Sequence, residues 1–171
     1  MQIQIDTREK TKAIEKIIKD FDKAGVKHFK SKLYVGDYMS LDDAKLVIDR
    51  KQDLQELCGN VCQQHERFKA ELVRALENDI KIVILCEHGN DVKSLEDVFF
   101  WQNPRKHNYY WTTVNGKRVR KVASKKAVDG KQLYKSLCTI RDRYNVDFVF
   151  CSKEETGKKI IEILGGNYGN C

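Results

Sequence analysis

The sequence predicts an α/β fold in which helices cover both faces of a mixed β-sheet, giving a three-layer α/β/α sandwich. Residues 80–86 (IKIVILC) are almost continuously apolar, as expected of a central strand that is buried on both faces. Apolar residues at helical spacing precede and follow this run, at 14–21 and at 133–140. Because a chain of 171 residues with 41% hydrophobic residues can bury one such core, we expect a single domain over residues 1–171.

The N-terminal half of the chain alternates short strands with helices. Asp6 and Glu9 have the spacing of a capping box, so the first helix is expected to begin there. Asp42 and Asp43 form an acidic turn between two strands, which predicts a hairpin. The predicted elements are a strand at 2–5, a helix from 6 to 25, strands at 33–39 and 45–51, a helical turn at 53–57 and a longer helix at 61–76.

The C-terminal half continues this alternation. Leu133, Leu137 and Ile140 form the inward face of an amphipathic helix, and Gly165 and Gly166 end the last helix. The predicted elements are a short helix at 95–101, a helix at 130–144, a strand at 147–151 and a helix at 156–164. Helices on both sides of these strands complete the predicted sandwich.

The charge of the chain points to a polyanionic partner. The net charge is +7 with 33% charged residues, and the sequence pI is about 9.0, which favours nucleic acid first and an acidic membrane surface second. No apolar run approaches the length of a membrane span and no secretory signal is visible, so we expect no membrane partner. The six cysteines do not form a disulfide framework, and Cys58 and Cys62 have only His65 nearby as a further zinc ligand. A reducing cytoplasm is the expected setting.

One segment lacks acidic residues altogether. Val98 to Val128 contains no Asp or Glu, and Asn115-Gly116 predicts a tight hairpin turn within it. We call residues 101–126 the basic flap. Basic side chains suit phosphate contact and aromatic rings suit stacking on unpaired bases; a solvated loop is the alternative, which the absence of acids disfavours. The candidate DNA-binding residues here are Arg105, Lys106, Trp111, Lys117, Arg118, Arg120 and Lys121.

Several acidic residues and one lysine are spaced so that strands would bring them together. Since side chains alternate along a strand, Asp49 and Lys51 share a face and Arg50 points the other way. Asp37 from the neighbouring strand and Glu9 from an earlier turn would add oxygen ligands for a hard divalent cation. The carboxylates would hold the cation, and the lysine would orient a bound water or offset charge on a phosphoryl group.

Each of these residues also has a purely structural alternative. Asp49 alone is more simply explained by an ion pair with Lys51 or Arg50, and only the company of Asp37 and Glu9 favours the metal site. Asp6 and Glu9 would stabilise a helix start by about 1 kcal/mol as a capping box. Arg67 and Glu71 have the i,i+4 spacing of a surface ion pair, and Arg8 either contacts phosphate or holds Asp6.

Five short strings in order resemble the XPF family of structure-specific DNA endonucleases, within the restriction-endonuclease-like superfamily. Each string is weak alone, but their order is specific, and together they cover roughly the first half of the chain. The strings are Ile5–Glu9 (IDTRE), Gly36–Tyr38 (GDY), Ile48–Lys51 (IDRK) followed by Asp53-Leu54, Glu66–Glu71 (ERFKAE) and Glu87–Gly89 (EHG).

The resemblance implies a magnesium-dependent endonuclease, with manganese able to substitute, that acts on branched or flapped DNA. Its implied catalytic residues are Asp37, Asp49, Arg50 and Lys51, and its implied metal ligands are Asp37, Asp49, Glu9 and Asp6, with Glu9 favoured over Asp6. Arg8 and Arg67 would then face the DNA backbone. The alternative is a non-catalytic DNA-binding subunit of a nuclease complex, against which the intact Asp37, Asp49 and Lys51 argue.

Two positions depart from the family pattern. Asp49 stands where the family has glutamate, and Asp53 lies two residues after the lysine instead of four. Family members often pair through helix-hairpin-helix domains, for which this chain has no room after its last predicted helix. Branch recognition is therefore expected from the basic flap, from a homodimer or from a protein partner. The resemblance places such a free-standing form in a bacterial or phage setting.

Overall fold

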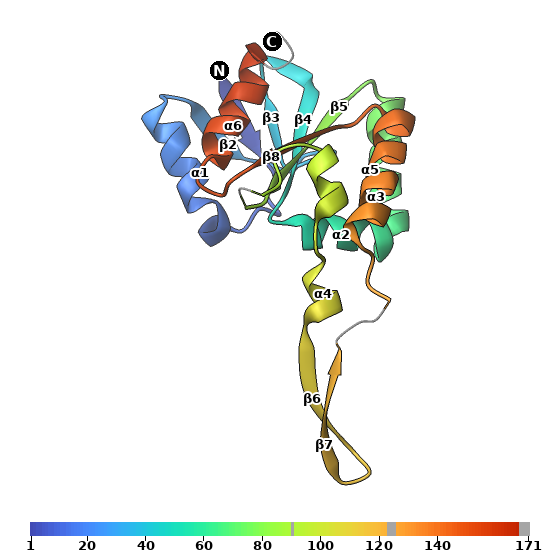
Figure 1. The fold of residues 1–171 in the computed structure, drawn as a ribbon. Helices are drawn as coiled ribbons and strands as arrows, with labels where there is room; N and C mark the ends of the chain where they lie inside the picture. The colour runs from blue at the N-terminus through green and yellow to red at the C-terminus, as the bar shows by residue number, and fades with distance from the viewer. Residues whose placement is uncertain (90, 123–125, 168–171) are drawn as a thin grey trace.

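The core of the computed structural model, which describes residues 1–89, 91–122 and 126–167, is a six-stranded mixed sheet (Figure 1). The strand order is β2-β1-β3-β4-β5-β8, and β3 runs antiparallel to both of its neighbours. Because β1, β4 and β5 run in the same direction, their carboxyl ends meet at one edge of the sheet. The strands are β1 (Gln2–Ile5), β2 (Lys27–Lys30), β3 (Tyr38–Ser40), β4 (Asp43–Lys51), β5 (Lys81–Glu87) and β8 (Asp147–Cys151).

Helices cover both faces of this sheet, which confirms the predicted three-layer sandwich. Adjacent residues of β4 point to opposite sides: Ile48 packs with Phe21 of α1 and Ile160 of α6, and Val47 with Leu57 of α2. Leu133 of α5 belongs to the same hydrophobic core as Val47. The helices are α1 (Thr11–Lys23), α2 (Leu54–Cys62), α3 (His65–Glu77), the 3₁₀ turn η1 (Glu96–Phe100), α4 (Pro104–His107), α5 (Gly130–Tyr144), α6 (Thr156–Glu162) and the π-helical turn η2 (Ile163–Asn167). Within the described residues, every helix is too short or too polar to cross a membrane.

The start of the first helix differs from the prediction. The helix begins at Thr11, not at Asp6, because the Asp6 carboxylate is occupied elsewhere. It accepts the backbone N–H groups of Arg8 at 2.8 Å and of Leu33 at 2.6 Å. The spacing that resembles a capping box instead builds a turn that fastens the end of β1 to a segment 27 residues away.

The strands around residue 30 also differ from the prediction. The predicted strand at 33–39 is reduced to Tyr38–Ser40, because Gly36 turns the backbone with a φ of +70°. The edge strand Lys27–Lys30 was not predicted, since its sequence KHFK lacks the apolar alternation of a half-buried strand. The predicted hairpin itself is confirmed by the antiparallel pairing of β3 with β4.

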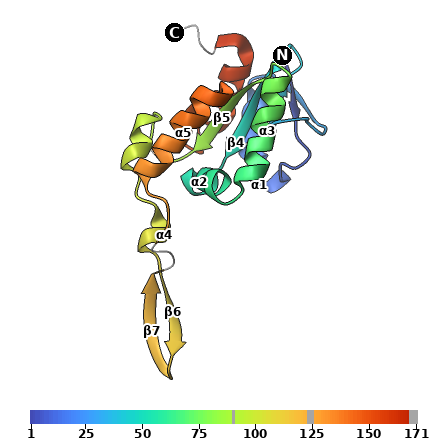
Figure 2. The ribbon, with the colours of Figure 1, turned by 90° about the vertical axis from the view of Figure 1, so that its right-hand side faces the viewer.

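The tight hairpin turn predicted within the basic flap is confirmed, and the hairpin extends away from the sandwich (Figures 1 and 2). Strands β6 (Tyr109–Val114) and β7 (Lys117–Val122) pair with each other and with no other strand in the described part of the chain. Asn115 and Gly116 both have positive φ, 51° and 74°, as a tight hairpin turn requires. Lys125 lies outside the described residues.

Gly130 fixes the root of the flap against the sandwich. A Cβ atom there would lie 2.5 Å from the carbonyl oxygen of Val98 and 2.6 Å from that of Trp101, both backbone atoms. We therefore expect Gly130→Ala to lower the free energy of unfolding by about 1–3 kcal/mol, measured by chemical denaturation. Gly59→Ala is the matched control, because a Cβ atom there would have no atom within 4 Å. Alanine in the interior of a helix should raise the free energy of unfolding by about 0.5–1 kcal/mol. Equal stability of the two variants would contradict this packing.

Candidate active site

The predicted acidic residues and lysine gather at the edge of the sheet where β1, β4 and β5 end. Asp49, Arg50 and Lys51 are the last three residues of β4, and Glu87 is the last of β5. The three residues of β4 border a cavity of about 280 Å³. The residues that line it are Arg8, Glu9, Asp37, Asp49, Arg50, Lys51, Glu56, Asn60, Gln64, Arg67, Phe68 and Glu71. The structure thus brings together seven of the predicted site residues, which are Arg8, Glu9, Asp37, Asp49, Arg50, Lys51 and Arg67.

Backbone geometry places Asp37 in this cavity. A Cβ on Gly36 would lie 3.0 Å from the carbonyl oxygen of Ile48, so glycine allows the chain to approach β4 closely while it turns. The backbone N–H of Asp37 donates to Ile48 at 2.7 Å, and the Asp37 carboxylate accepts the N–H of Arg50 at 2.9 Å. The carboxylate reaches the cavity, but protein surrounds most of it. This burial, followed by the charge of Asp49, raises the pKa of Asp37 well above its ordinary value.

Lys51 is held between a carboxylate and an aromatic ring. Its Nζ lies 2.6 Å from Oδ1 of Asp49 and 5.7 Å from the centre of the Phe68 ring. Burial acts to lower the pKa of Lys51, but the charge and hydrogen bond of Asp49 outweigh it and raise the pKa. The side chain is therefore a fixed ammonium at neutral pH.

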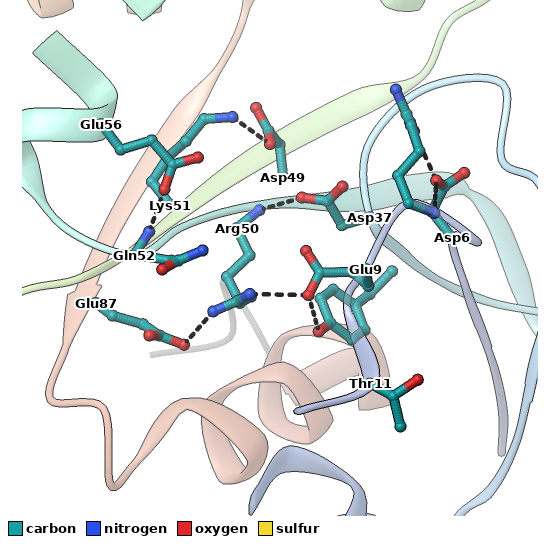
Figure 3. A network of polar contacts seen from close by, with 12 residues as sticks. Asp6, Glu9, Thr11, Asp37, Asp49, Arg50, Lys51, Gln52, Glu56 and Glu87 are labelled. Carbon is teal, nitrogen blue, oxygen red and sulfur yellow. Dashed lines mark hydrogen bonds and ion pairs between the residues drawn. The ribbon is translucent and has the colours of Figure 1, made fainter. Parts of the chain in front are cut away.

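Arg50 faces away from Lys51 and joins two carboxylates from different elements. Its guanidinium donates to Glu87 at 2.9 Å and to Glu9 at 2.8 Å, and Tyr38 also donates to Glu9 at 3.3 Å (Figure 3). The side chains of Arg50 and Glu87 are each only 3% exposed. Both ends of the guanidinium are thus taken, and its geometric effect is to hold Glu9 beside Asp37 in the cavity wall.

Asp6 lies outside this group. It does not line the cavity, and Figure 3 draws it apart from Asp49 and Lys51. Besides the two backbone groups described above, its carboxylate accepts Nε of Arg8 at 2.6 Å. Arg8 in turn donates to the carbonyl of Gly36 at 3.2 Å while half of its side chain stays exposed. Asp6 therefore positions Arg8 and the Gly36 turn.

The cavity lies in a stretch of the chain that is similar to a known protein family. Residues 5–164 match the ERCC4 domain. The chain belongs to the ERCC4 domain family. The match includes every cavity-lining residue and confirms the resemblance to XPF-type nuclease domains. A search of curated proteins finds no match for this ERCC4 domain.

Solved structures share the fold of this ERCC4 domain. XPF from Aeropyrum pernix superposes with a TM-score of 0.63 at 16% identity, covering 99% of this chain and 66% of that one. XPF from Aeropyrum pernix in complex with DNA gives a TM-score of 0.60 at 13% identity, covering 96% and 63%. This chain therefore spans about two thirds of their length, and the likeness establishes the restriction-endonuclease-like fold.

Several residues in and around the cavity of this ERCC4 domain make contacts that their sequence pattern did not predict. Glu71 does not pair with Arg67; its Oε1 accepts the N–H of Gly36 at 3.0 Å and ties α3 to the Asp37 turn. Arg67 is left facing the cavity. The sequence indicated Glu87 only as part of the EHG string and gave it no role. A carboxylate at the end of a buried strand nevertheless indicates that a buried cation lies opposite. Asp53, whose spacing departs from the family pattern, caps α2 by accepting the N–H of Glu56 at 2.8 Å.

The carboxylates suit a cation that keeps much of its water. Among the described residues, no three His, Cys, Asp or Glu side chains are placed to hold a metal ion together. Mg²⁺ at phosphate-processing sites is usually held by one or two carboxylates, waters and the substrate's phosphate, so it needs no such cage. Asp37 and Asp49 supply that number. Burial and then the charge of Asp49 raise the pKa of Asp37, and a bound cation would oppose both effects by favouring the ionised form. The donor set fits magnesium or manganese.

The predicted DNA-binding residues of the flap occupy two regions. Arg105 lines a groove with Asn60 and Gln64, which also line the cavity, whereas Lys106 pairs with Asp129 at 3.2 Å. Trp111 is 60% exposed on the hairpin. The remaining candidates, all exposed on β7, are Lys117, Arg118, Arg120 and Lys121.

Proposed function

We propose that this ERCC4 domain is a divalent-metal-dependent endodeoxyribonuclease that cleaves branched or flapped DNA. The observation that carries the proposal is the cavity in which Asp37, Asp49 and Lys51 meet at the carboxyl ends of parallel strands. Open α/β sheets commonly bind their ligands at this edge. Family membership supports a nuclease, and the DNA complex of the Aeropyrum pernix protein supports DNA as the substrate.

Asp37 and Asp49 would hold Mg²⁺, for which Mn²⁺ could substitute. Glu9 would become a further ligand by moving toward them, since no three such side chains are already placed around one ion among the described residues. When bound, the cation would lower the pKa of a water and offset charge on the phosphoryl oxygens. Arg50 keeps Glu9 turned toward the cavity through its 2.8 Å contact. Tyr38 donates to the same oxygen of Glu9, so the two contacts together restrain this side chain at the cavity wall.

Lys51 would act directly on the reacting phosphate. An ammonium has three N–H donors, and one of them is directed to Asp49. The other two are free to donate to a phosphoryl oxygen or to orient the attacking water. The Phe68 ring and the Asp49 carboxylate fix the position of Nζ, so its charge is preorganised for the transition state.

The cavity rim and the flap would bind the DNA backbone. Arg67 lines the cavity, and the exposed Arg8 is anchored by Asp6, so both can donate to phosphates. The basic flap would add phosphate contacts. Recognition of a branch would come from the flap, from a second copy of the chain or from a protein partner.

Cleavage assays test this proposal. Labelled flap, fork, duplex and single-stranded DNA should be incubated with Mg²⁺, with Mn²⁺ and with chelator. We expect cleavage with either ion, fastest on flapped or forked DNA, and none with chelator. The rival is a non-catalytic DNA-binding subunit, which the direct pairing of Asp49 with Lys51 would suit. DNA binding without cleavage of any substrate would favour that rival.

A further inference from the structure

The two faces of the β6–β7 hairpin differ in chemistry. Trp111 lies opposite Arg120, and Thr113 lies opposite Arg118. Because directly opposed residues share a face and side chains alternate along each strand, one face collects two large rings and both guanidinium groups, and the other collects Tyr110 and two lysines. We call Tyr109, Trp111, Arg118 and Arg120 the ladder face, and Tyr110, Lys117 and Lys121 the lysine face.

The ladder face is ordered as alternating rings and cations. Cζ of Arg120 lies 3.7 Å from the centre of the Tyr109 ring, and Cζ of Arg118 lies 5.4 Å from that of Trp111. Each arginine thus reaches diagonally past its direct partner to the aromatic ring nearer the root of the flap. These cation–π contacts hold the planar groups in place while Tyr109 remains 53% and Trp111 60% exposed.

Packing does not explain these exposed rings. The hairpin extends away from the sandwich, and none of the ladder residues belongs to either hydrophobic core (Figure 2). The acid-free segment also holds eight Lys and Arg residues, more than the net charge of +7, so the rest of the chain is nearly neutral. A ligand for this surface has flat apolar faces and negative charge, as nucleic acid does.

Base pairing decides which nucleic acid the ladder face can use. In a duplex, base faces are covered by neighbouring pairs, whereas unpaired nucleotides expose them to aromatic rings and to guanidinium planes. We infer that the ladder face is a stacking platform for unpaired nucleotides, and that the lysine face contacts phosphates whether or not the bases are paired. This inference rests on the proposed function and adds to it a binding site for the unpaired arm of the substrate.

A groove leads from the root of the flap to the active-site cavity. It runs along α2, where Asn60 and Gln64 line both the cavity and the groove, and it reaches Arg105 at the root of the flap. Figure 1 shows α2 at the end of the sandwich from which the flap extends. An unpaired strand on the ladder face would therefore lead along α2 toward Asp49 and Lys51.

Tryptophan fluorescence tests the stacking directly. The chain has two tryptophans, of which Trp101 is 6% exposed and Trp111 is 60% exposed. With chelator present to prevent cleavage, a single-stranded thymidine oligonucleotide should quench the emission of the exposed tryptophan. A duplex of the same length at equal occupancy should not. The quenching should disappear in Trp111→Phe, and quenching that persists there would overturn the inference.

Matched variants separate stacking from charge. Arg118→Ala with Arg120→Ala and Lys117→Ala with Lys121→Ala each remove two positive charges from the same hairpin. By fluorescence anisotropy, Trp111→Ala should weaken single-strand binding by about 5- to 150-fold, with a far smaller effect on duplex. The arginine pair should also weaken single-strand binding selectively, and the lysine pair should weaken both substrates by similar factors.

Two results would overturn different claims. If the arginine pair and the lysine pair change single-strand and duplex binding by the same factors, the hairpin is only a charged surface and the stacking platform is wrong. If the unaltered protein binds no DNA at all, both the stacking platform and the proposed nuclease function are wrong. A protein that binds both substrates but shows no selective loss overturns the platform alone.

Discussion

Replacing Asp49 with asparagine is expected to abolish metal-dependent cleavage, by a factor of about 10³ or more, while DNA affinity is retained. The amide has the size of the carboxylate and can still accept the hydrogen bond from Lys51, so the fold should persist. It lacks the charge that a hard cation requires. The measurement is single-turnover cleavage of a flap substrate at saturating protein, with anisotropy for binding.

The matched control for this variant is Asp43→Asn. Asp43 is exposed at the other end of β4, where its carboxylate accepts the N–H of Lys45 at 2.9 Å. The substitution is the same and the strand is the same, but the cavity is untouched, so cleavage should be unchanged. Cleavage by Asp49→Asn at the rate of the control would refute the assigned site.

Asp37→Asn separates activity from stability at the same site. Burial and the charge of Asp49 raise the pKa of Asp37, so its ionised form is disfavoured in the folded protein. Stability is therefore lost as the pH rises from the range where a free aspartate ionises to above this raised pKa. At neutral pH the variant should unfold at a higher denaturant concentration than the parent while it loses cleavage. Added Mg²⁺ should stabilise the parent but not the variant; equal stabilisation would contradict the ligand role.

Local signals allowed some elements to be predicted to the residue. The helix Gly130–Tyr144 has a capping box from Asp129 and Gln132 at its start, and Asn145 in a left-handed conformation at its end. All of these signals lie next to the helix in sequence. The order of the sheet has no such local signature, because β1 pairs with β2 on one side and with β3 on the other.

In the candidate site, too, contacts between neighbours in sequence were predictable and contacts between distant residues were not. Alternation along one strand correctly placed Asp49 with Lys51 and turned Arg50 away. The partners of Arg50 lie 41 residues before it and 37 residues after it, so only the assembled sheet brings Glu9 and Glu87 together. The spacing of Asp6 and Glu9 was misleading for the same reason, since Asp6 binds Leu33.

The second large effect is expected for Glu87→Ala, which should lower the free energy of unfolding by about 3–5 kcal/mol. The Arg50 side chain is 3% exposed, and its Nε already has no hydrogen-bond partner among the described residues. Removing Glu87 would leave part of a buried cation unpaired. Thermal and chemical denaturation should show the loss, and the melting temperature should fall by about 2–4 °C per kcal/mol in a domain of this size.

Glu87→Gln is the conservative control, because its amide oxygen can accept from Arg50 although the charge is lost. It should destabilise the protein less than Glu87→Ala. An apolar double variant, Arg50→Met with Glu87→Leu, then tests why the network is there. Well-packed apolar replacements of buried ion pairs are often neutral in stability. If the network serves to hold Glu9 at the cavity, the double variant should recover stability relative to Glu87→Ala yet cleave DNA poorly. Recovery of both would show that Glu9 needs no such support and that the pair contributes only to the fold.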